Sequence, residues 1–186
     1  VGVGAMAALL GLDLATAREV AEDASEGEVC AAANDNDPAQ VVISGHRAAV
    51  ERALEIAKAK GAKRAILLPV SAPFHCSLMA PAAEAMAEAL ATVDIRAPKV
   101  PLIANVIADA VEDPTLIRAL LVDQVTGSVR WRESVQTMVA RGVDEFWEIG
   151  AGKALSGMVR RIHREASVRT IGAPADVSAA TEALAG

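Results

Sequence analysis

The stretch "EVCAAANDNDPAQVVISGH", Glu28 to His46, puts two predicted strands directly one after the other. The runs "EVCAAAN" and "QVVISGH" are short and apolar, and the segment "NDNDP" between them has the Asn, Asp and Pro composition of a turn. A helical pattern lies on each side of the pair. The pair therefore decides the fold of this part of the chain, because two adjacent strands between two helices occur in only a few supersecondary arrangements.

The flanks of this stretch supply the remaining elements. Before it, Gly4–Leu12 is a short apolar run that predicts a buried strand, and Asp13 is placed to cap a helix that continues through Glu22. After it, Arg47–Gly61 has apolar residues at helical spacing and a terminal glycine, and Lys63–Val70 predicts a fourth strand. The resulting order, βαββαβ, is that of a ferredoxin-like unit.

The second half of the chain alternates strands with helices, which predicts parallel α/β packing. It has too few strands for a complete doubly wound sheet, so we expect part of one, with an apolar sheet edge left open. The fold class of the chain is thus α/β, with the ferredoxin-like unit as an α+β part. In chain order, the elements expected here are a helix at Ala80–Val93, a strand at Lys99–Val106, helices at Pro114–Val125 and 129–142, a strand at Glu145–Gly150, a helix at Gly152–Ala166 and a strand at Val168–Ala173.

Composition excludes several classes of function. The net charge is −6 and aromatic residues make up 2% of the chain, which argues against nucleic acid and against an anionic membrane as partners. Cys30 and Cys76 have no CxxC or CxxH spacing, so neither a metal site nor a disulfide framework is predicted, and a cytoplasmic location is expected. No apolar run reaches the roughly 20 residues of a membrane span. The start of the chain has no signal-peptide pattern. Its first residue, Val1, is not a methionine, so we expect the chain to begin inside a longer protein.

Three histidines are candidates for acid–base chemistry. His163 lies among arginines on a predicted helix and His46 stands where a helix begins, so both have structural interpretations. His75, in "VSAPFHCSLM", sits in a proline-containing loop directly after a buried strand, where site residues concentrate. Its neighbour Cys76 is an alternative nucleophile, but we expect it to be a small buried residue because sequence neighbours usually point apart. The chain contains no G-x-S-x-G elbow, so it supplies no serine partner of that kind for His75.

Two further segments match ligand-binding loops only in part. "GAGKALSG" lacks the full G-x-x-x-x-G-K-[ST] spacing of a phosphate loop, and a turn that starts a helix explains it. "NDNDPAQ" has Asn and Asp residues at calcium-like spacing but lacks the rest of an EF-hand loop. We therefore expect no metal site, and a turn in the second segment whose amides face a cleft.

Three long blocks, "ANDNDPAQVVISGHRAAVERA", "LPVSAPFHCSLMAPAAEAMAEAL" and "EIGAGKALSGMVRRI", resemble those of bacterial malonyl-CoA:acyl carrier protein transacylases. "GAMAALLGLD" resembles the strand that opens the small subdomain of that family. The resemblance covers nearly the whole chain and implies an α/β-hydrolase-like large subdomain with a ferredoxin-like insert. It assigns residues 1–73 to the ferredoxin-like small subdomain and residues 74–186 to the C-terminal part of the large one. The family's nucleophile elbow, oxyanion loop and carboxylate-binding arginine have no counterpart here, so the chain resembles the C-terminal portion of such an enzyme.

The resemblance also implies a mechanism and site residues. A serine outside this chain takes the malonyl group from coenzyme A, and the phosphopantetheine thiol of acyl carrier protein then accepts it, with no cofactor beyond these substrates. His75 is the general base, and the backbone carbonyl of Gln124 orients its ring in place of an aspartate. Phe74 goes with malonyl rather than methylmalonyl as substrate. Asn36 and Asn105 match polar positions near the cleft, and the resemblance implies that they bind substrate together with Phe74. Without the serine, this chain alone is expected to be inactive.

Two other functions stay open at this point. An acyltransferase domain of a polyketide synthase shares the fold and mechanism, and flanking sequence would distinguish it. A non-catalytic ferredoxin-like interaction module is the alternative of another class, although such a module would not need both "PFHC" and "EIGAGKAL". The complete enzyme is expected to be a monomer that docks acyl carrier protein on a local basic patch, for which the candidates are Arg130, Arg132, Arg160 and Arg161.

Overall fold

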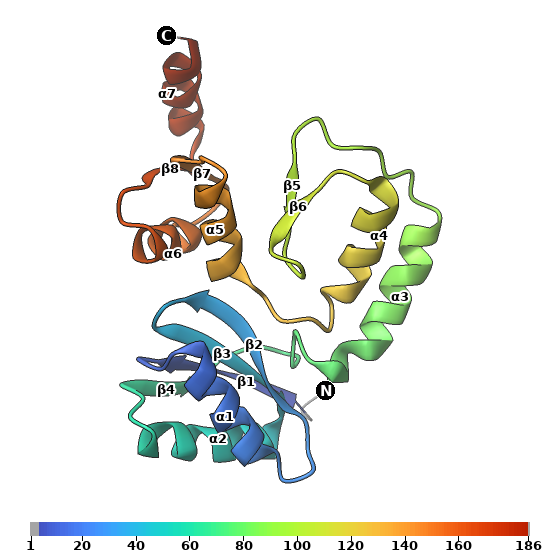
Figure 1. The fold of residues 1–186 in the computed structure, drawn as a ribbon, viewed down its shortest axis with the longest axis vertical. Helices are drawn as coiled ribbons and strands as arrows, with labels where there is room; N and C mark the ends of the chain where they lie inside the picture. The colour runs from blue at the N-terminus through green and yellow to red at the C-terminus, as the bar shows by residue number, and fades with distance from the viewer. Residues whose placement is uncertain (1–3, 186) are drawn as a thin grey trace. The chain divides into compact units, whose positions relative to one another are not determined.

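The two strands that decide the fold form an antiparallel hairpin in the computed structural model, which describes residues 4–185 (Figure 1). They are β2 (Cys30–Asp37) and β3 (Gln40–His46), so only Pro38 and Ala39 are left for the turn. The prediction that the first strand ends at Asn34, with a turn over "NDNDP", is wrong. The strand continues through this polar segment because Asp35 is buried and ion-paired, and two register shifts, between Ala32 and Asn34 and between Asp35 and Asp37, accommodate the polar residues.

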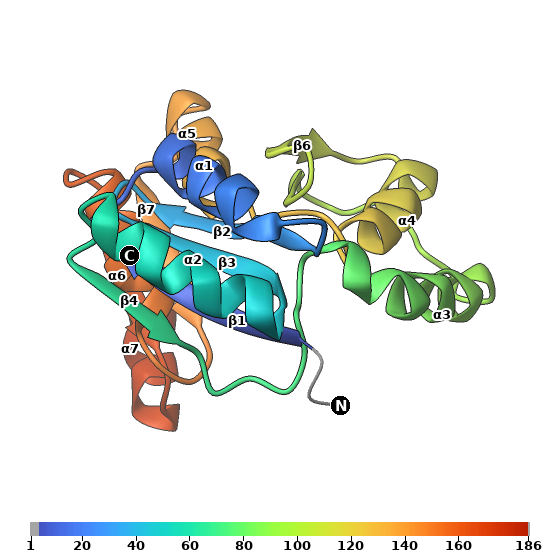
Figure 2. The same cartoon turned by 90° about the horizontal axis from the view of Figure 1, so that it is seen from below.

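The hairpin is part of a four-stranded antiparallel sheet with the order β2-β3-β1-β4. Its other strands are β1 (Gly4–Leu10) and β4 (Arg64–Leu67). The helices α1 (Leu14–Ser25) and α2 (Arg47–Ala59) connect the strands, which confirms the predicted βαββαβ order. Figure 2 shows both helices on one face of this sheet.

Small and β-branched side chains make the core between the sheet and these two helices. The fully buried residues Leu9, Ile43, Val20, Val41 and Val50 are the largest in it. Three alanines of each helix are buried as well, which lets the helices approach the sheet closely; they are Ala17, Ala21 and Ala24 in α1 and Ala49, Ala53 and Ala57 in α2. Burying a side chain of the size of leucine or valine contributes about 1.5–3 kcal/mol, so this cluster is the main source of stability in residues 4–67.

Local signals set the ends of these helices. The carboxylate of Asp13 accepts a hydrogen bond from the Thr16 amide at 2.8 Å, which confirms the predicted cap of α1. Gly61, predicted to end α2, lies one residue beyond the cap residue Lys60 and has a φ of 91°. His46 stands at the N-cap of α2, but its ring makes no cap; instead Nδ1 accepts a hydrogen bond from the Val29 amide at 2.9 Å.

The chain forms two compact units, residues 1–134 and 135–186, and the rest of the first unit follows the sheet in sequence. It contains a 3₁₀ turn (Ser77–Met79), α3 (Ala80–Ala91), β5 (Leu102–Ala104), β6 (Asp109–Val111) and α4 (Pro114–Asp123). The strand expected at Lys99–Val106 is therefore shorter than predicted. It pairs with the antiparallel β6, so the prediction of parallel packing is wrong here. The three residues of β6 are too few to produce a pattern in the sequence.

The second unit contains a parallel strand pair, as the sequence predicts. Helix α5 (Trp131–Ala140) leads into it, and β7 (Glu145–Ile149) pairs in parallel with β8 (Ser167–Ile171), with α6 (Ala154–Ile162) between them. Helix α7 (Pro174–Ala185) follows β8. No helix in the described part of the chain, residues 4–185, combines the length and the apolar character that crossing a membrane requires.

Candidate active site

His75 has an unusual backbone conformation. Its φ is 59°, in the left-handed region that non-glycine residues rarely adopt and that costs about 1–3 kcal/mol. The next residue, Cys76, is buried, and its thiol donates a hydrogen bond to the Pro73 carbonyl oxygen at 3.2 Å. This confirms the prediction that Cys76 is a small buried residue. The burial and the hydrogen bond of Cys76 hold the strained backbone of the adjacent His75 in place. This backbone presents the His75 ring.

Two backbone carbonyls hold the imidazole of His75. Its Nδ1 lies 3.1 Å from the Gln124 oxygen and 3.0 Å from the Gly127 oxygen, residues 49 and 52 positions away in the chain. Because a carbonyl oxygen can only accept, Nδ1 carries the hydrogen and donates it. The neutral ring then has its lone pair on Nε2, the form that can take a proton. The contact to Gln124 is at the position that the resemblance implies, whereas Gly127 was not identified from the sequence.

The end of α4 supplies these carbonyls. The Gln124 amide donates to the Leu120 oxygen at 3.0 Å, and the Gly127 amide donates to the Asp123 oxygen at 2.9 Å. A Cβ at position 127 would lie 3.0 Å from that Asp123 oxygen, which is tighter than ordinary packing. A glycine therefore suits this close approach to the Asp123 carbonyl.

A cavity of about 350 Å³ lies in front of His75. It is on the face of the sheet opposite α1 and α2, where Met6, Ala8 and Val42 form a small apolar cluster. The full lining is Met6, Ala8, Asn34, Asn36, Gln40, Val42, Leu68, Val70, Phe74 and His75. The cavity thus brings together a basic ring nitrogen, an aromatic side chain, an apolar floor and three amide side chains.

The amides of this cavity are not equivalent. Asn36 is predicted from the sequence and is buried, and Phe74, also predicted, is 40% exposed at the rim. Asn34, in β2, and Gln40, the first residue of β3, were not named as site residues from the sequence. The Oδ1 atom of Asn34 is buried and has no hydrogen-bond partner in the described structure. An unpaired buried carbonyl oxygen is costly, so it is a place where a ligand N–H would be favoured.

Asn105 lies at the end of β5 and does not line this cavity. Its Nδ2 donates to the Ser128 oxygen at 3.1 Å, and its Oδ1 accepts from the Arg130 amide at 2.9 Å. With Gln124 it lines a separate, mainly apolar cavity of about 250 Å³. The structure therefore brings Asn36, Phe74 and His75 together, joins Gln124 to them by a hydrogen bond, and places Asn105 behind the segment that holds the ring.

The arginines expected to dock a carrier protein all have partners. Arg132 binds the carboxylate of Asp35, which is 2% exposed, with Nε 3.0 Å from each carboxylate oxygen. This hydrogen bonding raises the pKa of Arg132. Arg130 pairs with Glu133 and donates to the Val106 oxygen at 2.9 Å. In the second unit, Arg160 donates to the Val168 oxygen at 3.1 Å, and Arg161 also has an interaction partner.

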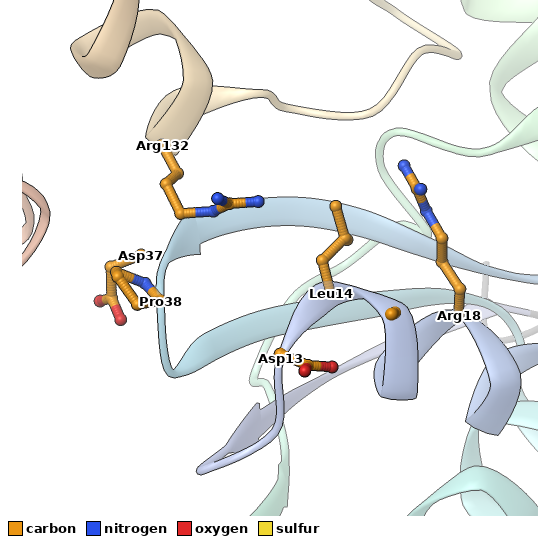
Figure 3. Close-up of a pocket in the computed structure, with 7 residues that line it drawn as sticks. Asp13, Leu14, Arg18, Asp37, Pro38 and Arg132 are labelled. Atoms are coloured by element: carbon orange, nitrogen blue, oxygen red, sulfur yellow. The ribbon is translucent and has the colours of Figure 1, made fainter.

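Arg132 also lines a third cavity, of about 370 Å³, whose side chains Figure 3 shows. Leu14 and Arg18 come from α1, Asp37 from the end of β2, and Pro38 from the turn between β2 and β3. Most of its charged groups have partners, because Asp13 caps α1, Asp37 accepts from the Ala39 amide at 3.0 Å and Arg132 binds Asp35. These groups stabilise the fold, so the cavity beside His75 is the better candidate for chemistry.

The glycine-rich turn before α6 has a structural role in the second unit. The carboxylate of Glu148 accepts hydrogen bonds from the amides of Leu155 at 3.1 Å and Ser156 at 2.7 Å. Hydrogen bonding from Ser156 and Leu155 lowers the pKa of Glu148. The amides that a phosphate loop would offer to a ligand are thus occupied by a carboxylate of the same chain. Within residues 4–185, no group of three or more His, Cys, Asp or Glu side chains is arranged to hold a metal ion.

Comparison with known proteins shows the family of the chain. Residues 1–181 match the acyl transferase domain family. The malonyl CoA-acyl carrier protein transacylase of Escherichia coli K12 is 45% identical over 181 residues, which are 97% of this chain and 59% of that protein. The crystal structure of acyl-carrier-protein-S-malonyltransferase from Bartonella henselae is 52% identical, with a TM-score of 0.95 over 100% of this chain and 59% of the other. A malonyl-transacylase in complex with its type II PKS acyl-carrier protein is 38% identical, with a TM-score of 0.94 over 97% of this chain and 59% of that one. The chain therefore spans about three fifths of the length of the relatives that it matches.

Proposed function

The chain belongs to the acyl transferase domain family, and from this membership we propose that it is part of an enzyme that transfers a malonyl group from coenzyme A to acyl carrier protein. The acceptor is the phosphopantetheine thiol of the carrier, and the pathway is fatty acid synthesis. The observation that carries the proposal is the His75 ring, held through Nδ1 by two carbonyls, with Nε2 left to act as a base beside a cavity.

In this mechanism His75 accepts the proton of a serine hydroxyl through Nε2 as the oxygen attacks the malonyl thioester carbon. The carbon–sulfur bond then breaks, and the proton held on Nε2 goes to the departing thiolate of coenzyme A. In the second half, His75 takes the proton of the carrier thiol, whose sulfur attacks the ester, and returns it to the serine oxygen. The two carbonyls stabilise the imidazolium in both halves, the task that a carboxylate performs in a serine–histidine–aspartate triad. The serine would come from the part of the relatives that this chain does not span.

The cavity beside His75 has features that suit such a substrate. The arm of coenzyme A carries secondary amides separated by short apolar segments, and the cavity combines an apolar floor with the amides of Asn34, Asn36 and Gln40. We assign the unpaired Oδ1 of Asn34 as an acceptor for an N–H of that arm. Phe74, at the rim, would limit the space for a second substituent on the acyl group.

The remaining expectations form part of the same proposal. Residues 1–73 would be a ferredoxin-like small subdomain and residues 74–186 the C-terminal part of an α/β-hydrolase-like large subdomain. The complete enzyme would be a cytoplasmic monomer that needs no cofactor beyond its two substrates. The 186 residues alone would not catalyse transfer, because they supply the base but not the serine that it activates.

The test uses two proteins: this chain alone, and a full-length protein in which the chain follows the N-terminal part of the kind that its relatives carry. Each is incubated with malonyl-CoA, and the intact mass is measured before and after addition of phosphopantetheinylated acyl carrier protein. We expect a covalent malonyl adduct that the carrier discharges in the full-length protein, and none in the chain alone. A stable adduct on the chain alone, lost when Cys76 is replaced by alanine, would move the nucleophile to Cys76. No transfer by the full-length protein would refute the proposed function.

One observation favours a second pathway. The chain is similar to a malonyl-transacylase solved in complex with a type II PKS acyl-carrier protein. The same chemistry could therefore serve polyketide synthesis, with a different carrier. Comparing kcat/KM of the full-length protein for a fatty acid carrier and for a type II polyketide carrier distinguishes the two pathways, since the preferred carrier identifies the partner.

A further inference from the structure

We infer that Asn105 is a positioning residue for His75, which acts by fixing the segment Gly127–Arg130 and through it the carbonyl that holds the imidazole. The inference deepens the proposed function, and only its kinetic consequence rests on that function. The resemblance implied a substrate contact for Asn105, but both ends of its amide are occupied by backbone groups of this segment.

The amide of Asn105 acts on two peptide groups at once. Its Nδ2 donates to the Ser128 oxygen at 3.1 Å, and its Oδ1 accepts from the Arg130 amide at 2.9 Å. Only a carboxamide offers a donor and an acceptor on one short planar group, so neither aspartate nor an apolar residue can make both bonds. The side chain therefore sets the distance and the orientation of residues 128–130.

Strand β2 holds the same segment on its other side. The Val129 amide donates to the Ala33 oxygen at 2.7 Å, and the Asp35 amide donates to the Val129 oxygen at 2.8 Å, which makes a short parallel bridge. The hydroxyl of Ser128 also donates to the Ala33 oxygen, at 3.1 Å. The segment is thus held between β2 and Asn105. Loss of Asn105 would remove both bonds to the backbone of the segment on that side and leave there the bond from the Arg130 side chain to the Val106 oxygen.

The link to His75 is short. The Gly127 carbonyl, 3.0 Å from Nδ1, belongs to the peptide that joins Gly127 to Ser128, and the next carbonyl is the one that Asn105 binds. A rotation of Ser128 therefore moves one of the two oxygens that orient the ring. A displacement of about 1 Å in a catalytic group can cost on the order of 100-fold in rate.

A substrate contact and a positioning role predict different results. A side chain that binds substrate changes KM and leaves the free protein as it was. A positioning residue lowers kcat with little change in KM, and it alters the His75 ring even when no substrate is present. The state of the ring can be measured directly, because the chain contains only His46, His75 and His163.

The experiment records the ring ¹⁵N resonances of His75 in the 186-residue chain near neutral pH, without substrate. In the wild-type chain we expect the Nδ1–H tautomer, because Nδ1 donates to two carbonyls. In Asn105→Ala we expect a shift toward the Nε2–H tautomer that a free imidazole prefers in water. In the full-length protein the same variant should lower kcat for malonyl transfer on the order of 100-fold, with KM little changed.

Asp113→Ala is the matched control. It removes the cap at the opposite end of α4, where the carboxylate of Asp113 accepts from the Thr115 amide at 2.9 Å. This variant should lower the melting temperature and leave the His75 resonances unchanged. Equal changes of the ring in both variants would overturn the inference, because they would reflect general loosening of α4.

Asn105→Asp covers the case in which the alanine variant does not fold. It keeps the shape of the side chain and the bond from the Arg130 amide and loses only the bond to Ser128, so the tautomer should shift in the same direction. If either Asn105 variant folds and keeps the wild-type His75 resonances, the inference is overturned. Failure of both variants to fold also overturns it, because Asn105 would then be a determinant of folding. If the full-length wild type transfers no malonyl group, the proposed function fails, while the ring measurement still decides the role of Asn105.

Discussion

Residues 4–67 and residues 77–123 have similar amounts of apolar sequence but bury it very differently. In the first region Leu9, Ile43 and Val50 are fully buried between a four-stranded sheet and two helices. In the second, α3 has no buried residue, and Met86 and Leu102 are 39% and 42% exposed. In both regions an apolar pattern thus predicts a helix or a strand. A closed core forms only where other helices and strands surround the apolar side chains.

The two regions also make different contributions to the candidate site. The first region supplies one wall of the cavity, the sheet face with Asn34 and Asn36, and the carbonyls that hold the ring belong to Gln124 and Gly127, directly after the second region. His75 lies in the connection between the regions, where it lines the cavity on the sheet.

Replacing His75 removes the group that joins the two regions. In the full-length protein, His75→Ala should lower malonyl transfer at least 10²- to 10⁴-fold, because the serine loses its proton acceptor. His163→Ala is the matched control and should leave transfer unchanged, since His163 lies after α6 in the second unit. The measurement is the steady-state rate with malonyl-CoA and carrier protein. Near-normal transfer by His75→Ala would show that His75 is not the proton acceptor.

Breaking the ion pair between Arg132 and Asp35 tests how strongly this pair holds β2 to the part of the chain that follows α4. Arg132→Met should destabilise the protein by about 3–5 kcal/mol, because it leaves the Asp35 carboxylate buried without its partner. The double variant Asp35→Asn with Arg132→Met should recover a large part of this loss. Urea unfolding followed by circular dichroism gives both values. A single variant as stable as the wild type would show that the pair contributes little.

A pair of leucines compares the two regions directly. Leu9→Ala in β1 should cost about 2–5 kcal/mol, because it leaves a cavity in the closed core. Leu116→Ala in α4, where the side chain is 43% exposed, should change stability by no more than about 0.5 kcal/mol. Native-state hydrogen exchange of the amides in each region measures both effects. Equal costs would contradict the contrast in burial.

Phe74, at the rim of the cavity beside His75, tests whether the connecting loop shapes the acyl pocket. In the full-length protein, a preference for malonyl-CoA over methylmalonyl-CoA of roughly 10–200-fold is expected, because one methyl group in an apolar pocket is worth about 1–3 kcal/mol. Phe74→Ser should reduce that preference by opening space for the methyl group. The ratio of kcat/KM for the two substrates is the measurement. An unchanged ratio would assign selectivity to residues outside this chain.

The smallest effect concerns the salt bridge between Arg130 and Glu133, next to the segment that holds His75. The hydrogen bond from Arg130 lowers the pKa of Glu133 below its ordinary value of 4.5. A carboxylate with a lowered pKa adds stability that is present above pH 4.5 and is lost as the pH falls through the lowered value. Because both side chains are more than one third exposed, we expect less than about 1 kcal/mol. The melting temperatures of the wild type and Glu133→Gln should therefore differ at pH 7 and converge once the pH has fallen below the lowered pKa of Glu133; a constant difference would contradict this assignment.

Elements set by local signals were predicted well from the sequence. Strand β3 runs over Gln40–His46 as expected, α1 begins after the cap at Asp13, and α4 begins at Pro114. Hydrophobic periodicity, caps and proline positions depend on residues a few places apart, so the sequence alone contains them. The position of His75 after a strand could also be predicted, whereas its contact with Gln124 came from a resemblance.

The tertiary structure decided what depends on distant partners. Asp35 stays in a strand, against its turn-like composition, because Arg132, 97 residues away, pairs with it. Gly127 holds His75 because the end of α4 brings a carbonyl to the ring, and no pattern in the sequence marks a backbone oxygen. By itself the sequence determined the order of elements in residues 4–67 and the base candidate. Only packing across the chain selected the side chains and carbonyls that surround it, because such contacts form between groups that sequence spacing does not relate.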